Sequence, residues 1–233
     1  MKNRVIISGA AGNLGMAVTK KFLNEKWSVV ALAEEGKPDQ VKKLENIAKV
    51  KPEVIPADLM DPYKSAKLVR KIWAEQPIHS AVLLVGGFSM NSLEKTTSEQ
   101  LEKMIKLNVL TAYNILQPLF ALMKEHGGGN VTLIGARPAL QPTDGEGAVA
   151  YALSKGILFH LAEIVNVGTN THGVAANVVV PSIIDTPENR EGMPDSDFSK
   201  WVKPEEIADA IYFAAEQSGK GLAGSVLKLY GQV

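Results

Sequence analysis

Short apolar runs alternate with helical segments along the whole 233-residue chain, and this alternation constrains the fold more than any other feature. Each run has the length of a buried strand, and each intervening segment has the spacing of an amphipathic helix. The predicted strands are residues 4–8, 27–33, 53–57, 78–85, 130–134, 174–180 and 225–229. The predicted helices are residues 13–25, 38–49, 62–75, 98–124, 149–166 and 204–217. This order predicts about seven parallel strands in one doubly wound α/β sheet, with helices on both faces.

No linker, repeat or low-complexity tract interrupts the pattern, so residues 1–233 are predicted to form a single domain. The longest helix, residues 98–124, is expected to begin at a Ser98 cap and to kink at Pro118. The longest irregular stretch, residues 182–203, follows the sixth predicted strand and contains several apolar residues. Because open α/β sheets bind ligands beyond the carboxyl ends of their strands, this stretch is predicted to be a lid over the substrate. A surface loop with its own small apolar cluster is the alternative.

Charge and cysteine content exclude several classes of function. The 25 basic residues equal the 25 acidic ones, so no excess of positive charge attracts nucleic acid. The lack of cysteine in the sequence excludes disulfides, cysteine zinc sites and a thiol nucleophile, and it is consistent with a reducing compartment. The apolar runs are too short to cross a membrane, and the first one ends at Ser8, too early for a secretion signal. We therefore expect a cytoplasmic protein with no membrane or nucleic-acid partner.

The first predicted strand leads directly into a glycine-rich turn and then into a helix. Glycine recurs there at every third position, which permits a tight turn and lets a pyrophosphate approach backbone N–H groups. The helix N-terminus adds a partial positive charge. A Rossmann-type dinucleotide site is therefore predicted at Gly9, Ala11, Gly12, Asn13, Leu14 and Gly15. An ordinary strand-to-helix turn is the alternative, because the spacing is not Gly-x-Gly-x-x-Gly.

The end of the second predicted strand is where such a site recognises the adenosine ribose. Glu34 stands at the expected distance, and its carboxylate would accept from ribose hydroxyls and repel the 2′-phosphate of NADP. Lys37, close by, is a residue that would serve a phosphate instead. The sequence favours NAD over NADP as the cofactor. Solvated loop charge is the alternative interpretation of Glu34 and Glu35.

Two further strand ends carry candidate cofactor contacts. Asp58 and Leu59 follow the third predicted strand, where the carboxylate would accept from an adenine amino group or would cap the helix that begins near Pro62. Gly86 and Gly87 follow the fourth predicted strand. Their missing side chains would let a flat cofactor lie against the backbone, and a plain turn is the alternative.

Tyr151 and Lys155 lie four residues apart near the start of a predicted helix, which places them on one face. A tyrosine with its usual pKa of about 10 is a weak acid-base group at neutral pH. A neighbouring ammonium favours the phenolate and is expected to lower that pKa. The pair would donate a proton during a reduction and accept one during an oxidation.

Taken together, these motifs resemble the short-chain dehydrogenase/reductase family over essentially the whole chain. The matching residues are Gly9, Gly12, Gly15, Asp58, Gly86, Gly87, Asn108, Tyr151, Lys155, Pro181 and Thr186. In this family the tyrosine is the general acid/base, the lysine binds the nicotinamide ribose, and the asparagine holds a water in a proton relay. The resemblance thus implies catalytic roles for Tyr151, Lys155 and Asn108. It implies nicotinamide contacts from the segment with Pro181, Ile184 and Thr186.

One departure narrows the resemblance. Most family members carry a catalytic serine at the end of the fifth strand, where this chain reads Ile134-Gly135-Ala136-Arg137. Thr143 and Ser182 are candidates to replace its hydroxyl. The chain is similar instead to the dihydropteridine reductase branch, which has Gly-Ala at that point and reduces quinonoid dihydropterin with NADH. Other similar segments are residues 25–30, 151–156, 185–187, 189–190 and 193–201. Ala33 departs from that branch, which has a ribose-binding Asp there.

We therefore expect an NAD(P)H-dependent oxidoreductase that acts on a small molecule, with quinonoid dihydropterin or a related compound as the leading substrate. A family member acting on another carbonyl or alcohol and a non-catalytic dinucleotide sensor are the alternatives. Arg137 and Arg190 are candidates to meet an anionic or pterin group. The four histidines lack metal-ligand spacing, so no metal site is expected. The predicted helix at residues 149–166 is apolar on nearly all sides, and family members pair it across an interface, so a homodimer or homotetramer is expected.

Overall fold

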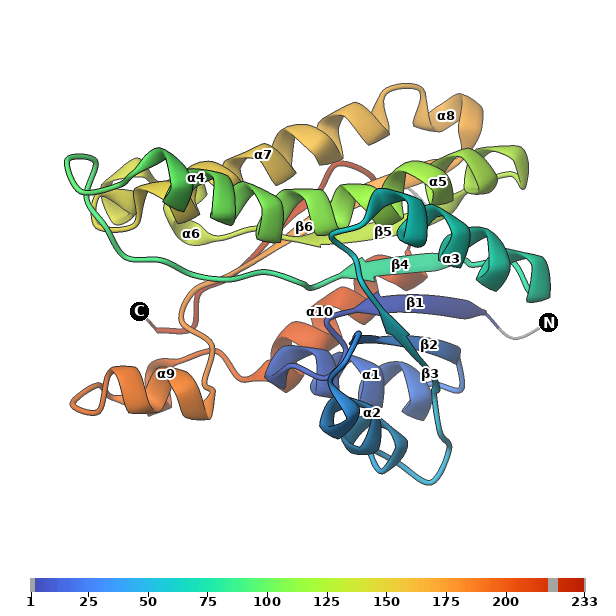
Figure 1. Ribbon diagram of the computed structural model, residues 1–233, viewed down its shortest axis with the longest axis horizontal. Coiled ribbons are helices and arrows are strands. Elements are labelled where there is room, and N and C mark those ends of the chain that lie inside the picture. Colours follow the sequence, from blue (N-terminus) through green and yellow to red (C-terminus); the bar gives the residue numbers. More distant parts are fainter. Residues whose placement is uncertain (1–2, 218–221, 233) are drawn as a thin grey trace.

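The computed structural model describes residues 3–217 and 222–232 (Figure 1). Within these residues, seven parallel strands form one sheet in the order β3-β2-β1-β4-β5-β6-β7. The strands are β1 Arg4–Ser8, β2 Ser28–Glu34, β3 Glu53–Ala57, β4 Ser80–Leu83, β5 Gly129–Ile134, β6 Val174–Pro181 and β7 Val226–Leu229. This arrangement confirms the predicted doubly wound parallel sheet.

Helices cover both faces of the sheet, with α3, α5 and α7 on one face and α1, α2 and α10 on the other (Figure 1). The α-helices are α1 Asn13–Asn24, α2 Pro38–Glu45, α3 Pro62–Glu75, α4 Ser98–Ile105, α5 Thr111–Glu125, α6 Arg137–Leu140, α7 Val149–Asn166, α8 Thr169–His172, α9 Pro187–Gly192 and α10 Pro204–Glu216. A strand covered on both sides must be apolar on both sides. In β1, Ile6 packs into the α3–α5–α7 core, whereas Val5 and Ile7 pack into the α1–α2–α10 core.

The position of the site follows from the strand order. β1 lies between β2 and β4, and the helix after β1 covers the opposite face from the helices after β4. Such a reversal opens a crevice at the carboxyl ends of the two strands, which is where open α/β sheets bind ligands. The turns after β1, β2, β3 and β4 all lie along this edge.

The predicted helix at residues 98–124 is confirmed as one continuous helical segment, but a π turn lies inside it. α4 ends at Ile105, a π turn spans Lys106–Leu110, and α5 follows. Pro118 lies buried inside α5, so the irregularity falls at the π turn and not at the proline. A π turn holds more residues per turn than an α-helix and is frequent at functional sites. Here it contains Asn108, whose buried side chain bonds to the chain after β4.

The predicted cap of this helix is wrong by one residue. Thr97, not Ser98, is the N-cap of α4. Its hydroxyl accepts from the Gln100 N–H at 3.3 Å, and its own N–H donates to the Gln100 side chain at 3.1 Å. This reciprocal pair satisfies two N–H groups that would otherwise lack partners, which is why the helix begins here.

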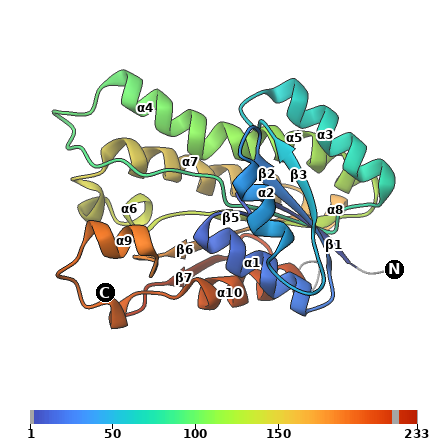
Figure 2. The same cartoon turned by 60° about the horizontal axis from the view of Figure 1, so that its bottom comes forward.

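Residues 182–203 contain more regular secondary structure than predicted. They contain α9 and a 3₁₀ turn at Phe198–Lys200, and Thr186 caps α9 by accepting from the Asn189 N–H at 3.2 Å. A β-bridge between Ile184 and Val202 joins the two ends of the stretch. Figure 2 shows α9 beyond the carboxyl end of β6, at the same edge of the sheet as the crevice.

The second helix is shorter than predicted and ends at Glu45. Asn46 stops it, since its side chain donates to the Lys42 carbonyl at 2.8 Å. In the part of the chain that the structure describes, no helix combines the length and the apolar character needed to span a bilayer.

Candidate active site

The turn between β1 and α1 has a geometry that requires glycine. Gly9 has a φ of +65°, in the left-handed region that favours glycine. A Cβ on Gly15 would lie 2.1 Å from the Gly9 carbonyl oxygen, so no side chain fits where the turn packs on α1. Gly12 is the N-cap of α1 and provides no side-chain hydrogen bond. The first N–H groups of the helix are therefore left for a ligand, as an anion site requires.

A cavity of about 510 Å³ opens beside this turn, at the carboxyl ends of β1 to β4. The predicted cofactor residues that line it are Gly9, Ala11, Gly12, Glu34, Asp58, Leu59 and Gly86. Gln40, Met60, Leu107 and Thr111 also line it and were not predicted. An unbonded helix N-terminus at one end and carboxylates at the other fit the pyrophosphate and adenosine of a dinucleotide.

Gln40 holds Glu34 at the wall of this cavity. The Glu34 N–H donates to Gln40 Oε1 at 2.9 Å, and Gln40 Nε2 donates to Glu34 Oε2 at 3.4 Å. Gln40 is placed for this because α2 begins at Pro38, just beyond the end of β2. The only sequence signal for Gln40 is that it falls in the first turn of the predicted helix after Glu34. Lys37 does not line the cavity.

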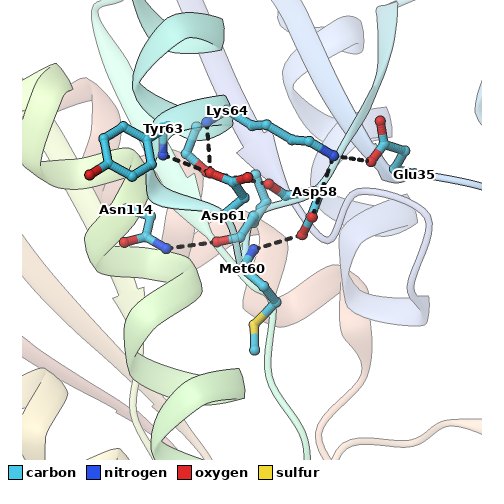
Figure 3. Close-up of polar contacts among 9 residues, drawn as sticks. Glu35, Asp58, Met60, Asp61, Tyr63, Lys64 and Asn114 are labelled. Atoms are coloured by element: carbon cyan, nitrogen blue, oxygen red, sulfur yellow. Dashed lines mark hydrogen bonds and ion pairs between the residues drawn. The ribbon is translucent and has the colours of Figure 1, made fainter.

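Asp58 faces the cavity and does not cap α3 (Figure 3). Asp61 is the cap, since its carboxylate accepts from the N–H groups of Tyr63 and Lys64 at 2.8 and 3.0 Å. Asp58 Oδ1 accepts from the Met60 N–H at 3.0 Å, which fixes the turn after β3. Of the two predicted roles for Asp58, the helix cap is therefore wrong. The adenine contact stays a prediction.

Asn108 joins the chain after β4 to α7. Its side chain is buried, Oδ1 accepts from the Gly87 N–H at 2.7 Å, and Nδ2 donates to Ser154 Oγ at 2.9 Å. The Ser154 hydroxyl in turn donates to the Tyr151 carbonyl at 2.8 Å. This chain of bonds fixes the first turn of α7 relative to β4. Ser154 was not predicted, and its position three residues after Tyr151 is its only sequence signal.

Lys155 is buried, and its ammonium donates to the Ile134 carbonyl at the end of β5, at 2.8 Å. Burial lowers the pKa of Lys155 to about 8. A Cβ on Gly86 would lie 2.6 Å from Asn108 Oδ1 and 3.3 Å from Lys155 Nζ. A side chain at position 86 would therefore displace the ends of the asparagine and lysine side chains that lie against this glycine.

Tyr151 lies one turn before Lys155 on the same face of α7, with its ring edge-on to Phe88 at a centroid distance of 4.9 Å. Burial raises the pKa of Tyr151 to about 12. The predicted lowering of this pKa by Lys155 is therefore wrong in this structure. The physical reason is that the Lys155 ammonium is bonded to the Ile134 carbonyl, while the loss of solvent around the phenol disfavours its charged form.

Comparison with known proteins identifies this arrangement. A family model for short chain dehydrogenase matches residues 3–196. The chain belongs to this family. Dihydropteridine reductase from Dictyostelium discoideum is 24% identical, over 98% of this chain and 94% of its own. The 3-oxoacyl-[acyl-carrier-protein] reductase FabG from Thermotoga maritima is 23% identical, over 97% of this chain and 95% of its own. The solved structure of ElxO with NADP bound has a TM-score of 0.90 at 21% identity, covering 99% of this chain and 98% of that one.

This short-chain dehydrogenase is therefore an NAD(P)-dependent oxidoreductase. Its departure from the family is visible at the end of β5, where Ala136 is buried and carries no hydroxyl. Ser182 directly follows β6, and Thr143 lies in the turn after α6, so the replacement of the serine by either hydroxyl stays a prediction. The Ser182 hydroxyl donates to the Tyr230 carbonyl at 2.6 Å, and Thr143 lies exposed in a 3₁₀ turn.

The remaining predicted residues lie outside the 510 Å³ cavity. They are Asn13, Leu14 and Gly15 in the first turn of α1, Gly87 after β4, Asn108 in the π turn, Tyr151 and Lys155 on α7, and Pro181, Ile184 and Thr186 at and beyond the end of β6. The Asn13 side chain donates to the Glu188 carboxylate, which joins the glycine turn to α9.

The two arginines singled out from the sequence are both in ion pairs. Arg137 Nε lies 2.7 Å from Asp144 Oδ2, and Arg190 pairs with Asp185 while stacking on the Phe198 ring at 4.9 Å. Among the described residues, no three side chains of the metal-binding types gather to hold a metal ion.

Proposed function

We propose that this short-chain dehydrogenase reduces a quinonoid dihydropterin or a related oxidised ring, with Tyr151 as the proton donor. The end of β5 carries the proposal, because Gly135 and Ala136 supply no hydroxyl there. A Cβ on Gly135 would lie 2.6 Å from Phe159 Cζ, so a side chain at that position requires repacking. A ketone oxygen gains negative charge during reduction and relies on more than one hydrogen-bond donor. A quinonoid ring spreads that charge over several atoms and depends less on a second donor.

The similarity beyond β6 supports the same substrate class. Residues 185–187, 189–190 and 193–201 resemble dihydropteridine reductases, and they lie in and around α9. We infer that residues 182–203 form a lid over the substrate, hinged at the bridge between Ile184 and Val202. The Arg190 guanidinium, stacked on the Phe198 ring and paired with Asp185, would give the lid a flat surface of the kind that suits an aromatic ring.

The proposed reduction uses one hydride and one proton. The nicotinamide of the bound cofactor supplies the hydride. The Tyr151 hydroxyl supplies the proton, which a phenol holds at neutral pH. Lys155 and Asn108 fix α7 against the ends of β4 and β5, which keeps Tyr151 in one place relative to the cavity.

We further propose that NADH is preferred over NADPH. Glu34 is held at the cavity wall by Gln40, and a carboxylate there accepts from ribose hydroxyls and repels a 2′-phosphate. Glu34 takes over the role of the ribose-binding acid, since the preceding residue is Ala33.

The decisive experiment measures oxidation of NADH and NADPH with quinonoid dihydropterin beside a panel of small ketones and quinones. We expect turnover to be fastest with NADH and the dihydropterin. Turnover of ketones alone would replace this proposal with a carbonyl reductase, the activity of the FabG relative. Dinucleotide binding without turnover of any compound would indicate a sensor.

We also propose that the enzyme is a homodimer or homotetramer through α7. Leu153, Ile157 and Ile164 are 54%, 39% and 68% exposed on this helix, an apolar stripe that a second copy would cover. Replacing Leu153 and Ile157 together with Glu is expected to give monomers at micromolar concentration in light scattering. Val50→Glu, at an exposed apolar residue of another surface, is the matched control and should leave the mass unchanged. A wild-type protein that is already monomeric would contradict the proposal.

A further inference from the structure

A second pocket borders the 510 Å³ cavity in which we propose that the adenosine end of the cofactor binds. A groove of about 470 Å³ lies against α3, and its wall carries Lys64, Lys67 and Lys71. Glu35, Ala57 and Asp58 line both the groove and the cavity, so the two hollows are neighbours at these residues. The lysines of α3 therefore lie next to Glu35 and Asp58, the acidic residues at this side of the cavity.

One of these lysines is held at that boundary by two carboxylates (Figure 3). Lys64 Nζ lies 2.9 Å from Glu35 Oε2 and 3.7 Å from Asp58 Oδ2. The backbone of Lys64 is fixed, because its N–H donates to the carboxylate of Asp61, the N-cap of α3, at 3.0 Å. Asp58 is fixed as well by its bond from the Met60 N–H. Glu35 is the partner at hydrogen-bond distance, so it determines where the ammonium is placed.

In the wild-type protein, the charges at this edge of the cavity disfavour binding of the 2′-phosphate of NADP. Glu34, Glu35 and Asp58 line the cavity, and the Lys64 ammonium is already bonded to Glu35. The Glu35 and Lys64 side chains are each about half exposed, so their ion pair is weak and opens without large rearrangement. Lys43 is a second ammonium nearby, and it donates to the Ala11 carbonyl at 3.0 Å.

We propose that the Glu35–Lys64 ion pair is a determinant of cofactor choice, in which Glu35 withholds Lys64 from the 2′-phosphate of NADP. Loss of the Glu35 carboxylate removes one negative charge from the edge of the cavity. It also frees the Lys64 ammonium, while the backbone of Lys64 stays fixed beside the cavity. The site then accepts a phosphorylated ribose. This inference rests on the proposed binding of the adenosine end in the 510 Å³ cavity.

The test measures binding by calorimetry, without substrate, using ADP-ribose and 2′-phospho-ADP-ribose as probes. In Glu35→Gln, the ratio of the dissociation constant for the phosphorylated probe to that for ADP-ribose is expected to fall about tenfold. In the double variant Glu35→Gln with Lys64→Met, this ratio should lie within about twofold of the ratio measured for the single variant Lys64→Met. Glu125→Gln, which makes the same charge change at the exposed end of α5, is the matched control and should leave the ratio unchanged.

Three results would overturn the proposal. The ratio does not fall in Glu35→Gln, the fall survives loss of Lys64, or the fall is abolished by Lys43→Met and not by Lys64→Met. Because the probes contain no nicotinamide and need no substrate, a failed dihydropterin assay leaves this test intact. If the wild-type protein binds 2′-phospho-ADP-ribose more tightly than ADP-ribose, the proposed preference for NADH is wrong. The role of the ion pair is still tested by the change in the ratio of dissociation constants between wild type and Glu35→Gln.

Discussion

Turnover is lost when Tyr151 is replaced with Phe: we expect kcat to fall by about 10³-fold or more, because a positioned general acid contributes about 10²–10⁴-fold. The phenol is the proposed proton source, and Ala136 supplies no hydroxyl at the end of β5. The Phe ring keeps the edge contact with Phe88, so α7 should fold unchanged. The measurement is steady-state kinetics with the best substrate of the panel, beside calorimetric binding of NADH.

The affinity for NADH separates loss of chemistry from loss of structure. We expect the dissociation constant for NADH in Tyr151→Phe to stay within about threefold of wild type, since one hydroxyl is removed from a large contact. Tyr212→Phe is the matched control, because its hydroxyl bonds Glu216 on α10, far from the cavity residues. If Tyr151→Phe retained more than about a tenth of wild-type kcat, the acid role of Tyr151 would be wrong.

A methyl group at Gly15 should break the glycine turn, whereas one at Gly12 should leave it folded. The added carbon at Gly15 lies 2.1 Å from the backbone oxygen of Gly9, and backbone cannot move aside as a flexible side chain can. Overpacking of this kind costs about 1–3 kcal/mol of unfolding free energy, and we expect Gly15→Ala to be near the upper end. Because the turn must shift, the affinity for ADP-ribose should fall at least about tenfold.

Gly12→Ala is the matched control for stability. Its added carbon would lie 3.4 Å from the same Gly9 oxygen, an ordinary contact, and Gly12 has a φ of −69°, which alanine adopts freely. We expect the urea-derived unfolding free energy of Gly12→Ala to stay within about 0.5 kcal/mol of wild type. Equal stability of the two variants would contradict the packing of the turn described above.

The fold class was predictable because its signals are local. Alternation of apolar runs with amphipathic segments depends on neighbours within one element, and a sheet covered on both faces demands it along every central strand. The glycines of the β1–α1 turn were predictable for a related reason: a left-handed φ at Gly9 and the contact of Gly15 with Gly9 arise within seven residues. The π turn within the helix at residues 98–124 was not predictable, because it serves a bond from Asn108 to the distant Gly87.

The sequence by itself thus determined the parallel sheet, the edge at which the cavity opens, and the residue types that line it. Only the tertiary structure decided how those residues are partnered. It bonds Lys155 to Ile134, raises the pKa of Tyr151 by burial, makes Asp61 the helix cap in place of Asp58, and joins Glu35 to Lys64. The physical reason is that hydrophobic periodicity depends on short-range order along the chain. Desolvation and side-chain pairing depend instead on groups that approach only after the strands have been ordered in space.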